Sequence, residues 1–154
     1  MKPIDLSRLN NHVDFGYFNQ NISRKSLKRS ITDKLKAWEL GKDYYDGDRN
    51  CGYGGFIDDG RWLKHLPKLL DLCAINSNTS NKISILDIGC KKGFIVDTAM
   101  KLGYSAIGIE NHSYPLKKAN KKIKQYLIKA DYHNLPFVDD SFEFCIAFSS
   151  IYMQ

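Results

Sequence analysis

The sequence predicts an α/β protein whose parallel sheet is doubly wound and carries about four strands. Two observations support this prediction. From residue 81 to residue 154, short apolar runs alternate with amphipathic stretches in the order β-α-β-α-β-β. Most of the apolar runs lead into a glycine or an acidic residue, which is typical of buried parallel strands whose carboxyl ends line a ligand crevice. Residues 1–80 are more polar and predict mainly helices.

The elements of the second half follow in order along the chain. Strands are predicted over residues 83–89, 105–110, 126–131 and 142–148. Apolar residues at helical spacing predict helices over 94–103 and 113–123. Gly103 is placed as the C-cap of the first of these helices. Ser113 is placed as the N-cap of the second, with Pro115 in its first turn.

The first half predicts two further helices, over residues 25–41 and 61–73, and Pro67 is expected to bend the second. Between them, residues 43–62 are rich in glycine and aromatic side chains. We therefore divide the chain into a helical N-terminal extension, 1–45, and a ligand-binding domain, 46–154. The expected strand order is 3-2-1-4, with the helical segment packed near the glycine turn that follows the first strand.

Composition and charge disfavour several classes of protein. The chain has 154 residues, a net charge of +6 and 43% hydrophobic residues, as expected of one globular domain. It lacks a run of about 20 apolar residues and its start has no apolar signal-peptide core, so we expect a cytoplasmic protein with no membrane partner. The basic stretches 24–38 and 117–124 lack interleaved aromatics, which favours solvated helix faces over a nucleic-acid site.

The four cysteines, Cys51, Cys73, Cys90 and Cys145, lie far apart and form no Cys-x-x-Cys pair. This spacing gives no support to a zinc site or to thioredoxin-like chemistry, and we assign no metal. We expect all four to be reduced and structural. Cys145, in the middle of the fourth predicted strand, is expected to lie in the core.

The stretch ILDIGCKKGF, residues 85–94, carries the strongest functional signal. Its two glycines, Gly89 and Gly93, would let the backbone approach a ligand closely. Glu110, about 20 residues after the turn, is placed to accept hydrogen bonds from both hydroxyls of a ribose, and Asp131 to accept from the amine of an adenine. Each acid alone is equally well explained as a polar strand cap, and Glu110 is expected to contribute little to the core. Polar residues at three successive strand ends together predict a ligand site.

The spacing of the glycines distinguishes two cofactors. The NAD fingerprint requires glycines where this chain has Lys91 and Phe94, so a nicotinamide oxidoreductase is disfavoured. The turn instead reads D-x-G-x-x-x-G, from Asp87 to Gly93. S-adenosylmethionine has no pyrophosphate; its amino-acid end needs an acid for its ammonium and free backbone groups for its carboxylate. The turn therefore favours S-adenosylmethionine.

The segments LDIGCKKGF, GIE, KADYHNLPFVDDSFE and CIAFSSIY resemble successive motifs of class I S-adenosylmethionine-dependent methyltransferases, over residues 83–152. The upstream GYGGFIDDGRW resembles a segment that precedes the first motif in some small-molecule methyltransferases. The resemblance implies a Rossmann-like fold, S-adenosyl-L-methionine as cofactor and a small-molecule substrate. The residues it implies are Asp87, Gly89, Cys90 and Gly93 at the methionine end, Glu110 at the ribose, Asp131 and Tyr132 at the adenine, and Ser149 at the end of the fourth strand.

Two features lie beside these motifs. Tyr53, with Gly54 and Gly55, is placed to form a lid over the cofactor, and Arg61 is available to a carboxylate. An aromatic and glycine-rich loop that only packs on the domain is the alternative. Lys91 stands where the family has a small residue, so its side chain must point outward or lie along the cofactor.

Methyl transfer is an in-line displacement, which needs alignment more than a dedicated nucleophile. His112 and His133 are candidate bases, although each is better explained as a loop histidine. No catalytic residue is therefore assigned.

The family fold has seven strands, whereas this chain is expected to stop just after the fourth, leaving 46–154 as an incomplete methyltransferase domain. The fourth strand would then be an apolar edge. A truncated gene product, a fragment of a larger protein and an oligomer that covers this edge all stay open. The rival function is an incomplete or degenerate fold that binds the cofactor, or a partner, without catalysis.

Overall fold

The computed structural model describes residues 28–73, 75 and 83–148, and every structural statement below concerns these residues. Its centre is a parallel sheet in the order β3-β2-β1-β4, which confirms the predicted order. The strands are β1 (Ser84–Ile88), β2 (Ser105–Glu110), β3 (Leu127–Lys129) and β4 (Phe144–Ile146). The chain is thus an α/β protein with a Rossmann-like sheet, and its strand order reverses between β1 and β4.

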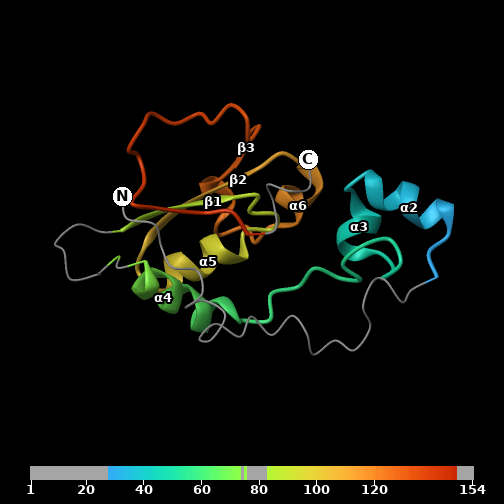
Figure 1. Ribbon diagram of the computed structural model, residues 1–154, viewed down its shortest axis with the longest axis horizontal. Coiled ribbons are helices and arrows are strands. Elements are labelled where there is room, and N and C mark those ends of the chain that lie inside the picture. The colour runs from blue at the N-terminus through green and yellow to red at the C-terminus, as the bar shows by residue number, and fades with distance from the viewer. Residues whose placement is uncertain (1–27, 74, 76–82, 149–154) are drawn as a thin grey trace.

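Six helical segments accompany the sheet in the described residues. They are α2 (Ile31–Trp38), α3 (Lys42–Asp46), α4 (Trp62–Leu72), α5 (Phe94–Lys101), α6 (Ser113–Lys118) and the 3₁₀ helix η2 (Lys124–Tyr126). Figure 1 shows α4 and α5 together against one side of the sheet, whereas α2 and α3 lie beyond it. None of the helices in the described ranges is long and apolar enough to cross a membrane.

The register of the sheet brings the carboxyl ends of its strands to the same end of the sheet. Asp87 of β1 pairs with Gly108 of β2 and with Ile146 of β4, and Glu110 ends β2 beside Lys129. Beneath these strand ends, the core is formed by side chains from β1, α4 and α5. Its fully buried members include Leu66, Ile85, Val96 and Ala99. The apolar residues that predicted these elements therefore make the core that holds the strand ends in place.

The end of α5 shows why Gly103 stops this helix. The Gly103 N–H donates to the carbonyl of Met100, and the Tyr104 N–H to that of Ala99, each at 3.0 Å. These two bonds form a Schellman motif, which requires a left-handed residue, and Gly103 has a φ of 87°. The C-cap itself is Leu102, one residue earlier than predicted.

The helix predicted over 25–41 is shorter and divided in the described residues. Ser30 is its N-cap: its hydroxyl accepts from the Asp33 N–H at 3.1 Å, and the Asp33 carboxylate accepts from the Ser30 N–H at 2.9 Å. This capping box starts α2 at Ile31. α2 ends at Trp38, and a second short helix, α3, begins after Gly41.

The helix predicted over 113–123 is wrong in its second half and at its start. α6 ends at Lys118, and Ala119 is extended. The Asn120 side chain then accepts from the Lys122 N–H at 3.1 Å, a local bond that competes with helix formation. The N-cap is His112 rather than Ser113, and it makes no side-chain capping bond.

The two outer strands are shorter than predicted, and one core assignment was wrong. β3 ends at Lys129 rather than at Asp131, and β4 spans three residues. Cys145 is exposed while Ile146 beside it is buried, because neighbouring residues of a strand point to opposite faces and β4 is an edge strand. All four cysteines are free thiols, as predicted.

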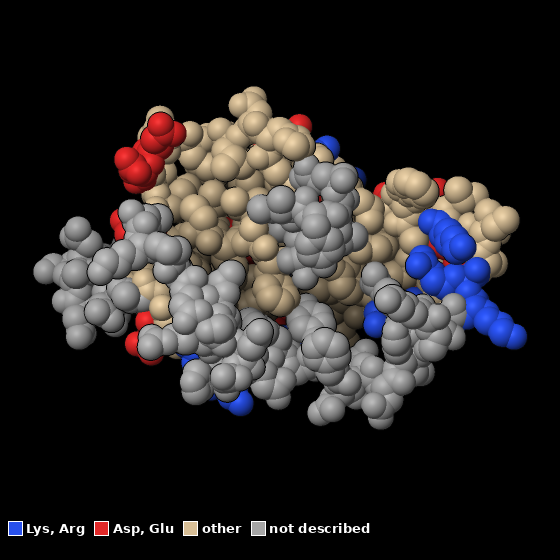
Figure 2. All heavy atoms as spheres, viewed as in Figure 1, with Lys and Arg blue, Asp and Glu red and all other residues tan. Residues whose placement is uncertain are grey.

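Charge is distributed unevenly over the surface. Figure 2 shows the Lys and Arg side chains visible on one face gathered mainly at the end of the molecule that carries α2. Lys34 and Lys36 on α2 are exposed, as are Lys117 and Lys118 at the end of α6. These lysines are open to solvent, and the expectation that they bind no nucleic acid stays a prediction.

Candidate functional site

β1 ends in a tight turn that depends on two glycines. Gly89 and Gly93 have φ angles of 75° and 76°, in the left-handed region that glycine adopts without steric cost. A Cβ atom on Gly93 would lie 2.8 Å from Cδ1 of Ile123, so α5 can start here only without a side chain at this position. The N–H groups of Gly89 and Cys90 both donate to the carbonyl of Ile109 at 2.9 Å. The turn is thereby held against β2.

Cys90 fits under the turn because Gly108 of β2 has no side chain. A Cβ atom on Gly108 would lie 2.7 Å from both Cβ and Sγ of Cys90. Cys90 is 5% exposed, and this burial raises the pKa of its thiol, with further raising by the charges of Asp87 and Glu110. The thiol is therefore neutral at physiological pH and offers a ligand an apolar contact rather than a nucleophile.

Asp87 is the most unusual polar residue of the site. It is 2% exposed, and its Oδ2 atom has no hydrogen-bond partner among the described residues. Burial raises the pKa of its carboxyl to about 7, while Lys91 lowers this pKa and Glu110 raises it further. A buried carboxyl oxygen without a donor is costly, so this atom is suited to receive one from a ligand.

A pocket of about 470 Å³ opens beside Asp87. It lies over the end of β1, where the strand order reverses, which is where doubly wound sheets bind ligands. The glycine turn forms one wall, and Phe148, just past β4, belongs to another. The Phe148 ring meets the Trp62 ring edge-on at 5.3 Å between centroids. This volume is that of a small-molecule site.

Aromatic residues of the loop between α3 and α4 form the wall opposite the turn. The rings of Tyr53 and Phe56 lie 4.7 Å apart, and Phe56 stacks on Phe94 of α5 at 5.0 Å. Tyr45 of α3 also stacks on Tyr114 of α6 at 6.1 Å. The loop thus packs on the domain and lines the pocket at once, and it brings the helical segment next to the glycine turn as predicted.

Arg49 shapes the glycine part of this loop. Its Nη1 donates to the carbonyl oxygens of Gly52 and Tyr53, each at 3.0 Å. Gly54 is left-handed, with a φ of 70°, and a Cβ atom there would lie 3.0 Å from the Arg49 side chain. The Arg49 side chain therefore packs against a position that has room only for glycine. No pattern in the sequence had indicated Arg49.

Asp46 and Lys92 anchor the same loop, and the sequence analysis singled out neither. Lys92 is 9% exposed, and its ammonium donates to Oδ1 of Asp46 at 2.5 Å and to the carbonyl of Phe56 at 2.8 Å. The Tyr114 hydroxyl donates to Oδ2 of Asp46 at 3.0 Å. Burial would raise the pKa of Asp46, but the bonds from Lys92 and Tyr114 outweigh it and hold that pKa below its ordinary value. A single lysine in a turn gave no signal of such a partner.

Lys91 occupies a strained place in the turn. Its φ is 55°, in the left-handed region that is unfavourable for a residue with a side chain. Its ammonium lies 5.5 Å from the centroid of the Tyr53 ring and 5.6 Å from that of Phe56. The side chain therefore reaches across to the loop and lines the pocket, rather than pointing outward.

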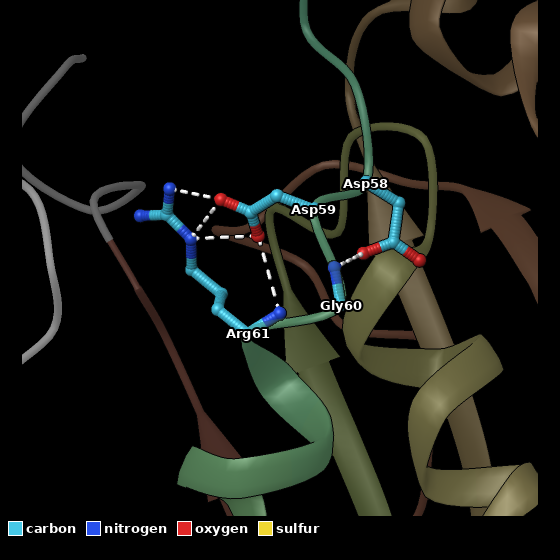
Figure 3. A network of polar contacts seen from close by, with 4 residues as sticks. All are labelled: Asp58, Asp59, Gly60 and Arg61. Atoms are coloured by element: carbon cyan, nitrogen blue, oxygen red, sulfur yellow. Dashed lines mark hydrogen bonds and ion pairs between the residues drawn. The ribbon is translucent and has the colours of Figure 1, made fainter.

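Arg61 already binds a carboxylate of its own chain (Figure 3). Its Nε donates to Oδ1 and Oδ2 of Asp59 at 2.8 and 2.6 Å, and its Nη2 also contacts Asp59. These bonds hold the pKa of the Asp59 carboxyl below its ordinary value. Asp58 accepts from the Gly60 N–H at 3.0 Å in the same bend. A ligand carboxylate would therefore compete with Asp59 for Arg61.

Glu110 and Tyr132 come together in a second cluster. Glu110 is 2% exposed, and its Oε1 accepts from the His112 N–H at 2.8 Å and from the Tyr132 hydroxyl at 3.0 Å. The His112 ring atom Nδ1 lies 2.9 Å from the same oxygen, and the Lys91 N–H donates to Oε2 at 3.1 Å. The expectation that Glu110 contributes little to the core was wrong, because it is buried and accepts hydrogen bonds on both carboxylate oxygens.

Only some of the predicted site residues line the pocket. Those that line the pocket are Tyr53, Gly54, Gly55, Arg61, Asp87, Gly89 and Cys90, whereas its lining does not include Gly93, Glu110, Asp131 or Tyr132. Asp131 is exposed in the loop after β3, and its Oδ1 accepts from the His133 N–H at 3.0 Å. Ser149 lies outside the described residues. Neither candidate base, His112 or His133, lines the pocket.

Comparisons with known proteins agree with part of this picture. Residues 86–153 match the model of a family described as a methyltransferase domain. Among solved structures, the chain is similar to the PH0226 protein from Pyrococcus horikoshii OT3, with 18% identity and a TM-score of 0.44. That similarity covers 70% of this chain and 48% of the other, so this chain spans about half of that protein's length. The search of curated proteins finds no match.

Proposed function

We propose that this chain binds S-adenosylmethionine and transfers its methyl group to a small molecule. The observation that carries the proposal is the unpartnered, buried Oδ2 of Asp87 on the wall of the pocket of about 470 Å³ at the switch point of the sheet. The match of residues 86–153 to a methyltransferase domain supports methyl transfer in general. The glycine turn, which lacks the NAD spacing, supports this cofactor.

The residues present fit the amino-acid end of the cofactor. Asp87 offers a buried oxygen to its ammonium group. α5 starts at the pocket after Gly93, whose position provides no side-chain cap. The first N–H groups of a helix lack intrahelical partners, and Phe94 and Ile95 line the pocket. We therefore assign the carboxylate to these N–H groups.

When bound, S-adenosylmethionine supplies a methyl group on a positively charged sulfonium. The chain's own part is to bind, orient and exclude water, which suits an in-line displacement. Phe56, Trp62 and Phe148 give the pocket apolar walls for these tasks. Because the thiol of Cys90 is held neutral, the pocket supplies no competing nucleophile from this residue.

A second candidate is a fold that binds a ligand without catalysis. The state of Glu110 favours it, because the oxygens meant for the ribose already accept hydrogen bonds within the chain. The strained Lys91 in the turn points the same way.

Isothermal titration calorimetry on the full chain tests the proposal. We expect S-adenosylmethionine and S-adenosylhomocysteine to bind and NAD not to bind. Asp87→Asn should weaken both by at least tenfold, because it removes the charge facing the ammonium. Asp97→Asn, which alters an acid on α5 paired with Lys101, is the matched control and should leave binding unchanged. Binding of NAD alone would overturn the proposal, and binding of none of the three would leave only the non-catalytic fold.

A further inference from the structure

We propose that Tyr132 is a gate on the ribose site: its hydroxyl occupies the place of a ribose hydroxyl on Oε1 of Glu110 and must leave before a ribose can bind this oxygen. This inference rests on the proposed function and concerns the same site. It names a residue that sets affinity and selectivity for the nucleoside.

The Oε1 atom of Glu110 has no spare acceptor capacity for a ribose. A carboxylate accepts at about four lone-pair positions. In this chain the Lys91 N–H, the His112 N–H, the His112 ring and the Tyr132 hydroxyl lie 2.8–3.1 Å from its two oxygens. Three of these groups lie on Oε1, and the residue is only 2% exposed. A ribose hydroxyl can therefore bind Oε1 only by replacing one of these three groups.

Tyr132 is the group that can be replaced. The Lys91 N–H belongs to the turn held against β2, and the His112 N–H lies only two residues from Glu110, so these two donors are fixed by the local backbone. The His112 ring belongs to the same short segment. Tyr132 is 22 residues from Glu110 and reaches it from the loop after β3. Both neighbours of Tyr132, Asp131 and His133, are exposed. A rotation of this one side chain frees one acceptor position on Oε1, while the two His112 contacts stay in place.

A ribose hydroxyl can replace both hydrogen bonds that the Tyr132 hydroxyl makes. The Tyr132 hydroxyl donates to Glu110 at 3.0 Å and accepts from the Asn111 N–H at 3.4 Å. A ribose hydroxyl also has one donor and can accept from the same N–H, so it satisfies both partners that Tyr132 leaves. A nucleoside without these hydroxyls cannot do so. The gate thus selects for ligands with an intact ribose.

Calorimetric titration with S-adenosylhomocysteine tests the gate on the full chain. Tyr132→Phe keeps the ring and removes the competing hydroxyl, so we expect about tenfold tighter binding, equivalent to about 1.4 kcal/mol. Tyr104→Phe is the matched control, because Tyr104 precedes β2 at the opposite end of the strand from Glu110, and its affinity should not change. In a Glu110→Gln background, Tyr132→Phe should give no further gain.

The wild type, Tyr132→Phe, Glu110→Gln and the double variant form a double-mutant cycle. We also measure this cycle without ligand, by chemical unfolding. We expect the Glu110 and Tyr132 changes to be coupled in stability, which a change at Tyr104 would not be. The absence of coupling would overturn the gate. If the wild type binds S-adenosylhomocysteine but Tyr132→Phe binds it equally or more weakly, the gate is overturned and the proposed function stands. If neither protein binds it, both fail together.

Discussion

Asp87 shows at the scale of one residue how burial changes chemistry. Its carboxyl has an ordinary pKa of 3.8, and burial in the folded chain raises this pKa to about 7. Between these values the folded protein holds a proton that the unfolded chain has lost. Stability must therefore fall as the pH rises from about 4 to about 7, because the folded state binds more protons over that range.

We expect Asp87→Asn to remove this fall, since an amide does not titrate. The measurement is urea unfolding of both proteins at a series of pH values across the range from about 4 to about 7. Asp97→Asn serves as the control, because this acid lies on α5 and is paired with Lys101, whose side chain is 56% exposed. Equal pH slopes for wild type and Asp87→Asn would contradict the assignment of the buried proton to Asp87.

Lys91 permits a second test at this scale. Its left-handed backbone costs roughly 1–2 kcal/mol, which Lys91→Gly relieves, while glycine loses about 0.5–1 kcal/mol through the unfolded chain. The ammonium contacts with Tyr53 and Phe56 contribute another 0.5–1 kcal/mol, roughly. We expect Lys91→Gly to unfold close to wild type, with ligand affinity equal or improved.

Lys91→Ala separates these effects, because it loses the ammonium but keeps the strained backbone. We expect it to be less stable than Lys91→Gly by about 1 kcal/mol in the same unfolding experiment. Equal stability of the two variants would show that the backbone at this position is not strained.

At the scale of elements, Asp46 joins four parts of the chain. It ends α3, binds Lys92 of the glycine turn, accepts from Tyr114 of α6 and accepts from the Phe56 N–H at 3.3 Å. Because the pKa of Asp46 is lowered, its contribution to stability is present at neutral pH and is lost only as the pH falls below about 3.8. This network helps to position the loop over the pocket.

Removing the ammonium should loosen that loop. We expect Lys92→Met to speed hydrogen exchange over residues 42–56 while β1 and β2 keep their protection, at a cost of about 1–3 kcal/mol for the unpaired Asp46. Lys101→Met is the matched control, because the Lys101 side chain is 56% exposed in its pair with Asp97. Unchanged exchange over residues 42–56 would show that aromatic packing alone holds the loop.

At the scale of the whole molecule, β4 forms one edge of the sheet in the described residues, and Cys145 on it is exposed. Cys51 and Cys90 are buried, so the native protein has thiols of very different accessibility. An oligomer that covers this edge, one of the three alternatives left open by the sequence, would protect Cys145. The rate at which Cys145 reacts therefore indicates whether a partner covers the edge strand.

We expect a maleimide to label Cys145 faster than Cys90 in the native protein, because labelling of a buried thiol needs local unfolding. The measurement is peptide mass spectrometry after a short reaction at low and at high protein concentration. Slower labelling of Cys145 at high concentration would support the oligomer. Equal rates for Cys145 and Cys90 would contradict the burial described above.

Much of the fold was predictable because it depends on residues close together in the chain. Apolar runs predicted all four strands and their order, and Gly103 predicted the stop after α5. Helix ends were less predictable, because local bonds such as that of Asn120 compete with a helical pattern. The glycine turn was also readable, since Gly89 and Gly93 adopt left-handed backbone that few other residues tolerate.

The state of the site, by contrast, depends on partners that no periodic pattern encodes. Lys92 meets Asp46 across 46 residues, and Tyr132 meets Glu110 across 22. Burial decides the rest: the same acid type is an exposed turn residue at Asp131 and an unpartnered buried group at Asp87. The local sequence thus sets the order of the strands and the shape of the turn. Only the packing of distant segments decides which side chains lose water, and hence which carry a shifted pKa or a hydrogen bond that a ligand must replace.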